Sequence, residues 1–245
     1  MCDEYYNYLA EDFHLKRKNP WKALDVFLIK IRTKFDIFNG FIVDIGCGNG
    51  RNIPLLKTED NKIIGIDNSL ELIKIARKAS QSNSYPKEKQ NKAIQFILSD
   101  FLYLPIRKNR IETIASIASL HHVRSKSNRK KAVLEMCQIL KEGGYLILSI
   151  WRRYQKKYKL YFLKDYIKKN ISLSYNRKQK ALGLQDFGDK LVPWTVAKNN
   201  LTYNRFYHFF SKFEIKRLLS CFKLKIIEKL GGPNQKDNFF ILARK

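Results

Sequence analysis

The sequence predicts an α/β fold with a mainly parallel, seven-stranded sheet that ends in an antiparallel hairpin. Two observations support this prediction. From residue 41 to residue 150, short apolar segments alternate with amphipathic ones, as expected for parallel strands joined by right-handed crossovers. Near the end of the chain, two more apolar segments flank Gly231-Gly-Pro-Asn234, a sequence typical of a tight turn. With 245 residues, the chain has the size of a single domain.

The N-terminal part is expected to be helical. Residues 5–34 read as helix, with an interruption at Pro20-Trp21. After that interruption, apolar side chains recur at helical spacing and form one stripe, at Leu24, Phe27, Leu28 and Ile31. We therefore expect residues 1–37 to form a helical cap that precedes the sheet.

The remaining elements follow from the alternation of apolar and polar segments. We predict strands at 41–45, 62–66, 94–98, 111–117, 144–150, 222–230 and 238–243. The predicted helices are 50–57, 69–79, 127–140 and 211–221, and the polar segment Ser80–Lys92 is expected to be a surface loop. Residues 152–210 form a basic, aromatic-rich insertion, so the chain is one domain, 1–245, with an insertion before its last helix and hairpin.

The most informative segment is Phe41-Ile-Val-Asp-Ile-Gly-Cys-Gly-Asn-Gly50, in which an apolar strand runs into three glycines. Gly46, Gly48 and Gly50 allow a sharp turn and a close approach of the backbone to a nucleotide-like ligand. Asp44 can order this loop or accept a hydrogen bond from an amine of the ligand. NAD is disfavoured, because Arg51 stands where the dinucleotide pattern requires its third glycine.

Acidic residues also end the next two strands. Asp67 follows the strand at 62–66, at the position where an acid that binds a ribose is expected. Asn68-Ser-Leu-Glu71 then resembles a capping box that opens a helix. Ser99-Asp100-Phe101 ends the strand at 94–98 and offers an acid and an aromatic ring for an adenine. Any one of these acids could be a loop residue that caps a helix, but three of them at successive strand ends favour a nucleotide-like ligand.

Taken together, these motifs resemble the class I S-adenosylmethionine-dependent methyltransferases over roughly residues 38–151. The resemblance implies a Rossmann-like class I methyltransferase fold and S-adenosylmethionine as cofactor. The expected cofactor-binding residues are Asp44, Gly46, Gly48, Gly50, Asp67, Asn68, Asp100, Phe101 and Ser116.

Four further motifs resemble one family within this class, the eukaryotic tRNA (carboxymethyluridine) methyltransferases. They are Phe13-His-Leu-Lys-Arg17-Lys-Asn-Pro20-Trp21, Ser116-Ile-Ala-Ser-Leu-His121-His122, Val192-Pro-Trp194 and Arg205-Phe-Tyr-His208. The resemblance implies methylation of a wobble uridine that carries a 5-carboxymethyl group, giving the methyl ester. The chain departs from the family pattern in two ways: Lys22 replaces a common proline, and the long low-complexity insert that larger members carry before Arg205 is missing.

This reaction places few demands on the protein. A carboxylate with a reference pKa near 4 is already ionised at neutral pH, so no general base is required. Both charges vanish in the transition state, so neutral donors should hold the carboxylate better than a strong cationic clamp. We expect four residues to act in this way, namely His121, His122, Tyr207 and His208, and Arg17 to bind a phosphate or the far carboxylate oxygen. Each could instead be a packed or capping residue.

The formal net charge of +26 predicts a nucleic-acid partner, and the family resemblance implies that this partner is the tRNA anticodon loop. From Arg152 to Lys180 there are eleven Lys and Arg but one acid, interleaved with tyrosines. This pattern suits contacts with phosphates and bases. The alternatives are that an A/T-rich genome inflates the lysine content, or that these lysines form only a solvated helix face.

The cysteines, at 2, 47, 137 and 221, form no Cys-x-x-Cys pair, so neither a disulfide framework nor a metal site is predicted. We expect a cytoplasmic protein without a membrane segment. The family resemblance implies a small zinc-binding activator subunit along the apolar edge strand 94–98. Two other functions remain open: a catalytically silent RNA-binding subunit and a small-molecule methyltransferase.

Overall fold

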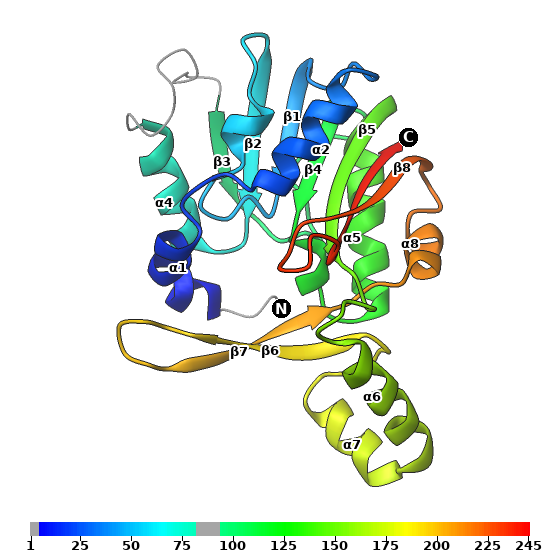
Figure 1. The fold of residues 1–245 in the computed structure, drawn as a ribbon. Coiled ribbons are helices and arrows are strands. Elements are labelled where there is room, and N and C mark those ends of the chain that lie inside the picture. The colour runs from blue at the N-terminus through cyan, green and yellow to red at the C-terminus, as the bar shows by residue number, and fades with distance from the viewer. Residues whose placement is uncertain (1–4, 82–93) are drawn as a thin grey trace.

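The computed structural model describes residues 5–81 and 94–245, which form a central sheet with helices on both faces (Figure 1). Most of the predicted loop Ser80–Lys92 therefore lies outside the described residues. The strands of the main sheet have the order β3-β2-β1-β4-β5-β9-β8. They are β1 (Gly40–Ile45), β2 (Asn61–Asp67), β3 (Ile94–Leu98), β4 (Ile111–Ile117), β5 (Leu140–Trp151), β8 (Lys223–Leu230) and β9 (Asn238–Arg244).

The strands β1 to β5 are parallel, and β9 lies antiparallel between β5 and β8. This arrangement confirms the predicted sheet and its terminal hairpin. Most predicted strands agree with the observed bounds to within one residue. The exception is β5, which begins at Leu140 rather than at 144, directly after the preceding helix. Its N-terminal part begins to pair with β4 at Ile111↔Leu140 and then shifts register.

The described residues form eight α-helices, five of which pack on the two faces of the sheet. They are α1 (Tyr5–Lys16), α2 (Lys22–Arg32), α3 (Ile53–Leu56), α4 (Leu70–Gln81), α5 (Lys126–Ile139), α6 (Lys159–Ile171), α7 (Leu173–Ala181) and α8 (Lys212–Leu218). The buried side chains of α2, α3 and α4 pack on one face with Ile42 of β1, and those of α5 and α8 pack on the other face with Val43. Two layers of helix around one sheet bury most of the apolar side chains. None of the described helices is both long and apolar enough to cross a membrane.

The four helices predicted at 50–57, 69–79, 127–140 and 211–221 all begin at a different residue in the structure, three of them by one residue. The helix expected at 50–57 is reduced to α3, because the glycine turn continues to Gly50, whose φ is +75°. The helix α4 is capped by Ser69, whose hydroxyl accepts from the Leu72 amide at 3.3 Å, one residue later than the predicted cap. At α8 the motif Ser211-x-x-Glu214 does form a cap, with the Glu214 amide donating to the Ser211 hydroxyl at 3.2 Å.

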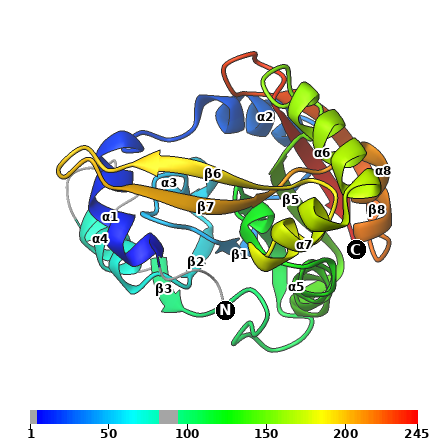
Figure 2. The ribbon, with the colours of Figure 1, turned by 90° about the horizontal axis from the view of Figure 1, so that it is seen from below.

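The insertion between β5 and α8 contains structure that the sequence did not reveal to us. Two strands, β6 (Asp189–Thr195) and β7 (Thr202–His208), form a separate antiparallel sheet. This β6–β7 hairpin crosses below the carboxyl ends of the main strands, and α6 and α7 pack together beside it (Figures 1 and 2). The hairpin therefore faces the edge of the sheet at which ligands bind in such folds.

Candidate functional site

A cavity of about 740 Å³ lies at the carboxyl edge of the main sheet. Its walls come from α1, from the loops after β1, β2 and β4, from the β6–β7 hairpin and from the turn before β9. In open α/β sheets, ligands bind at this edge. The cavity is therefore the candidate site.

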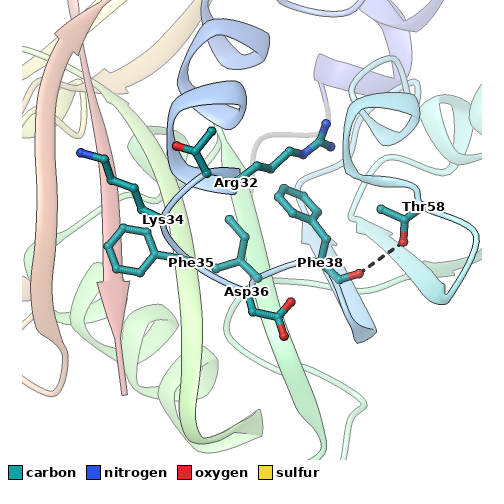
Figure 3. Close-up of a pocket in the computed structure, with 8 residues that line it drawn as sticks. Arg32, Lys34, Phe35, Asp36, Phe38 and Thr58 are labelled. Atoms are coloured by element: carbon teal, nitrogen blue, oxygen red, sulfur yellow. Dashed lines mark hydrogen bonds between the residues drawn. The ribbon is translucent and has the colours of Figure 1, made fainter.

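A second hollow of about 550 Å³ lies at the opposite edge, before β1 and β2 (Figure 3). It is shallow and is lined by residues 32–38 and by Thr58. The Thr58 hydroxyl donates to the Phe38 carbonyl at 3.3 Å, so the two loops are already bonded to each other there. The side chains of Lys34 and Asp36 do not converge on a common point in this view.

One half of the cavity lies beside the glycine loop, where the sequence predicts the cofactor. We call it the cofactor half. Gly46, Gly48 and Gly50 all have positive φ, at +76°, +56° and +75°. A Cβ on Gly46 would lie 2.4 Å from the Ser119 Cβ, so no larger residue fits there. A Cβ on Gly48 would meet nothing closer than a Phe13 ring atom at 3.7 Å, so the backbone is open to the cavity at that position.

Asp67 connects this loop to the start of α4. Its Oδ2 accepts from the Gly48 amide at 2.8 Å and its Oδ1 accepts from the Ser69 amide at 2.9 Å. Burial raises the pKa of Asp67, and the backbone hydrogen bonds oppose that rise. Because Asp67 lines the cavity and each oxygen has a further lone pair, the carboxylate can also accept from two hydroxyls of a ribose.

Asp44 and Ser116 lie within the sheet, below the cavity rather than on its wall. Both are almost completely buried, and neither Asp44 Oδ1 nor Ser116 Oγ has a hydrogen-bond partner among the described residues. Burial, followed by repulsion from Asp67, raises the pKa of Asp44 to about 7. A buried carboxyl group with an unused acceptor is suited to a cationic group of a ligand.

Of the other residues predicted to bind the cofactor, some line the cavity and others do not. Asn68 and Phe101 line the cavity together with Gly46, Gly48 and Asp67. Asp100 and Gly50 do not, and Asp100 Oδ1 instead accepts from the Leu102 amide at 2.9 Å.

Ser119 is a residue of this half that the sequence analysis missed. Its hydroxyl lies 2.9 Å from the Gly46 carbonyl and 2.9 Å from the Ile117 carbonyl, so it holds the end of β4 against the glycine loop. It lies in the motif that we quoted from Ser116 to His122, where spacing alone does not distinguish the two serines.

The other half of the cavity, which we call the acceptor half, is lined mainly by aromatic rings. The His121 ring stacks on the Tyr207 ring at a centroid distance of 4.9 Å and an interplanar angle of 18°, and Trp151 lies beside both. Burial, followed by the nearby His122, lowers the pKa of His121 well below its usual value, so the ring is neutral at physiological pH. His121 Nδ1 has no hydrogen-bond partner among the described residues.

His122 is fixed by two hydrogen bonds. Its Nδ1 donates to the Phe206 carbonyl at 3.0 Å, so Nε2 is the acceptor for the Tyr6 hydroxyl at 3.0 Å. Burial, followed by the charge of Arg205, lowers the pKa of His122 to about 3. These bonds connect α1 to the short helical turn after β4 and to β7.

Arg205 is the second residue that we missed. It is 6% exposed and lies over the rings of Trp194 and Tyr207, at 4.4 and 5.1 Å from their centroids. Its Nε–H has no acceptor among the described residues, although it lines the cavity. Arg17 also lines the cavity but is exposed, near Trp194 at the rim.

His208 was expected on the acceptor side, but the structure does not bring it to the cavity. It is fully buried, and its two nitrogens lie 2.6 Å from Asp189 Oδ1 and 2.7 Å from Glu214 Oε1. Arg153 and Arg129 extend this network through Glu214 and Asp186. Asp186, Asp189 and His208 are close enough to hold a metal ion, but these bonds already engage them. We therefore assign His208 to the support of the β6–β7 hairpin.

The helix α1 closes the cavity. Asp12 accepts from the Trp194 indole at 2.7 Å and from the Ala197 amide at 2.9 Å, so α1 is bonded to the β6–β7 hairpin. Asn49 of the glycine loop donates to His14 and to the Arg17 carbonyl at 3.1 and 3.0 Å. Figure 2 shows α1 and the hairpin side by side across the sheet edge.

Comparisons with known proteins agree with this geometry. Residues 43–148 match a family described as "Methyltransferase domain". A tRNA (carboxymethyluridine(34)-5-O)-methyltransferase from Schizosaccharomyces pombe is 29% identical over 99% of this chain and 95% of its own length. A Xenopus tropicalis relative of the same activity is 24% identical over 98% of this chain but 40% of its own length, so it is a much longer protein.

A crystal structure of a SAM-dependent methyltransferase from Methanosarcina mazei matches with a TM-score of 0.68 and 23% identity, over 88% of this chain and 96% of that one. This match supports the fold. The domain match and the geometry of the glycine loop agree with this fold and with S-adenosylmethionine as cofactor.

Proposed function

We propose that the chain transfers a methyl group from S-adenosylmethionine to the carboxylate of 5-carboxymethyluridine at the wobble position of tRNA, giving the methyl ester. The observation that carries this proposal is Arg205, a buried guanidinium in the acceptor half that is not matched there by an acid. No carboxylate of the described residues forms an ion pair with it. Such a site is suited to an anionic acceptor. The names of the relatives that align along the whole chain support the same reaction.

The residues of the cofactor half fit S-adenosylmethionine, which supplies an electrophilic methyl group on a sulfonium when bound. Gly48 leaves room for close approach, Asp67 can accept from the ribose hydroxyls, and Phe101 offers a ring for the adenine. Asp44 is buried next to the glycine loop rather than on the cavity wall, so we assign it a longer-range attraction to the ammonium of the amino-acid part. This assignment of roles is part of the proposal.

The acceptor half performs binding and orientation. A carboxylate is already ionised near pH 7, so the neutral His121 and His122 are not needed as bases. Attraction to Arg205 is strongest in the ground state, so Arg205 selects and holds the acceptor rather than lowering the barrier. His121 and Tyr207 provide neutral donors and exclude water from the reacting oxygen.

Mass spectrometry of tRNA nucleosides from cells that lack the gene tests the reaction itself. We expect 5-carboxymethyluridine to accumulate and its methyl ester to disappear, and re-expression of the parent chain should restore the ester. An unchanged nucleoside profile would reject the proposal.

The variant Arg205→Ala tests whether Arg205 recognises the carboxylate of the acceptor. We compare the binding of two anticodon stem-loops that differ only in carrying uridine or 5-carboxymethyluridine. The parent should prefer the carboxymethylated one, and the variant should lose that preference while retaining S-adenosylmethionine binding. Equal weakening of both stem-loops would mean that Arg205 only supports the fold.

The sequence analysis also predicts a partner protein along the edge strand β3. This strand is at the edge of the sheet and Leu98 is 49% exposed, so an apolar edge is left unpaired among the described residues. We propose that a small zinc-binding subunit adds a strand there. Co-expression should then be required for a soluble, active enzyme, and a monodisperse, fully active single chain would exclude such a subunit.

A further inference from the structure

The α6–α7 hairpin (residues 156–181) presents an unusual density of unpaired positive charge. Eight of its cations are exposed, and none of them forms an ion pair with a described residue. They are Lys156, Lys157, Lys159, Lys164, Lys168, Arg177, Lys178 and Lys180.

No acid of the hairpin compensates this charge. Asp165 is its single acidic residue, and it is buried. Its carboxylate is already bonded within the hairpin, to the Tyr175 hydroxyl at 3.0 Å and to the Lys169 ammonium at 3.0 Å. The exposed lysines therefore repel one another, and a surface of this kind is stabilised by an anionic partner.

The tyrosines of the segment serve the fold instead. Tyr158 is buried, Tyr175 is bonded to Asp165, and Tyr166 packs on Phe187 at 5.4 Å between ring centroids. Tyr158 and Tyr175 are therefore not free to stack on splayed bases, whereas Tyr166 remains 54% exposed. Because exposed cations outnumber exposed rings here, contact with a nucleic acid at this surface is mainly contact with its phosphates.

The charged surface continues to the mouth of the cavity. Lys157 and Tyr158, directly before α6, both line the cavity. The exposed Arg17 lies at the cavity rim on α1's side, and Figure 2 shows α1 and α6 at opposite ends of the β6–β7 hairpin. A nucleotide inserted between them would carry its flanking backbone over α6.

We infer that the α6–α7 hairpin holds the anticodon stem-loop by its phosphates, next to the nucleotide that enters the cavity. This inference rests on the proposed function. An acidic protein is the competing occupant, because α6 also exposes aliphatic residues: Leu160, Leu163, Ile167 and Ile171 are 47% to 78% exposed. The continuity of the lysines with the cavity favours the RNA.

The test replaces Lys156, Lys164 and Lys168 with glutamine and leaves Lys157, which lines the cavity, in place. The matched control replaces Lys34, Lys108 and Lys223, which are also exposed but lie at the opposite edge of the sheet. Loss of three phosphate contacts should reduce the slope of log affinity for tRNA against log salt by about 2. We expect a roughly tenfold higher KM for tRNA in the hairpin variant only, with unchanged S-adenosylmethionine affinity.

The inference is wrong if both triple variants keep the parent's salt slope and KM. It is also wrong if the slope and the KM change equally in the two variants. A second variant, Leu163→Ser with Ile167→Ser, should leave the slope unchanged, and a loss equal to that of the lysine variant would also overturn the inference. If the parent forms no methyl ester on any tRNA, the proposed function fails. The salt slopes, which need no catalysis, still decide whether the hairpin binds RNA.

Discussion

The two halves of the cavity are built in different ways. The cofactor half is made largely of backbone: three glycines with positive φ, and amides that Asp67 holds in place. The acceptor half is made of side chains from α1, the turn after β4 and the β6–β7 hairpin. We expect substitutions in the cofactor half to abolish cofactor binding. Substitutions in the acceptor half should reduce activity toward the acceptor by smaller factors.

Gly46→Ala should give the largest effect. The new Cβ would clash with Ser119 and Phe101, and the positive φ is unfavourable for alanine. We expect a loss of about 2–4 kcal/mol in the free energy of unfolding and no measurable cofactor binding. Gly48→Ala is the matched control, because it has positive φ but no close neighbour, and it should cost about 1–2 kcal/mol. Urea unfolding of both variants measures the difference, and equal losses would contradict the packing argument.

Asp67→Asn should weaken S-adenosylmethionine binding by tenfold or more. An amide cannot accept from both the Gly48 and Ser69 amides through two oxygens, and a hydrogen bond to a charged group is typically worth about 1.5–3 kcal/mol. Asp100→Asn is the control, since Asp100 bonds to Leu102 and does not line the cavity. Isothermal calorimetry should show a much smaller change for that control. If it instead weakens binding as strongly, Asp100 contacts the cofactor after all.

The pH dependence of S-adenosylmethionine binding should reveal the ionisation of Asp44. Its pKa of about 7 means that the carboxyl group is mostly protonated at pH 5.5, so affinity for a cationic ligand should rise roughly tenfold between pH 5.5 and pH 7. Asp44→Asn should bind more weakly and lose that dependence.

The same raised pKa has the opposite effect on stability. Because the folded state retains a proton that the unfolded chain loses near pH 4, stability of the parent should fall as the pH rises from about 4 to about 7. At pH 8, Asp44→Asn should therefore be the more stable chain, by about 1–2 kcal/mol. A variant less stable than the parent at pH 8 would show that Asp44 has a partner in solution.

Tyr6→Phe should give the smallest effect. It removes the hydroxyl that donates to His122 Nε2 but keeps the ring that packs on the same histidine. Loss of one neutral hydrogen bond costs about 1 kcal/mol, so kcat/KM for tRNA should fall about fivefold while cofactor affinity is kept. Tyr8→Phe, on the same helix but 71% exposed, should change neither parameter. A larger loss for Tyr8→Phe would point to RNA contact along α1.

The sequence predicted the cofactor half because its signals are local. A strand, three glycines and the acids at the next strand ends lie within short segments, and parallel strands bring their carboxyl ends to one edge. What the sequence could not show is which of these acids faces the cavity. Asp67 is the last residue of its strand and lines the cavity, whereas Asp44 lies within β1 and Asp100 lies two residues beyond β3.

The acceptor half was predicted less well because we did not recognise β7 as a strand. Side chains alternate between the two faces of a strand, so Arg205 and Tyr207 share one face, whereas His208 lies on the other. Had the motif Arg205-Phe-Tyr-His208 been interpreted with that period, Arg205 would have replaced His208 among the expected site residues. The contact of Tyr6 with His122 joins residues 116 positions apart, and no local pattern indicates it.

The hydrogen bonds of α1 couple the two halves of the cavity. One helix is tied to the glycine loop through Asn49, to the acceptor histidine through Tyr6 and to the β6–β7 hairpin through Asp12. A ligand that orders the glycine loop thereby also fixes the wall against which the nucleotide must fit. Cofactor binding beside the glycine loop is therefore coupled, through this single helix, to the shape of the wall on the acceptor side.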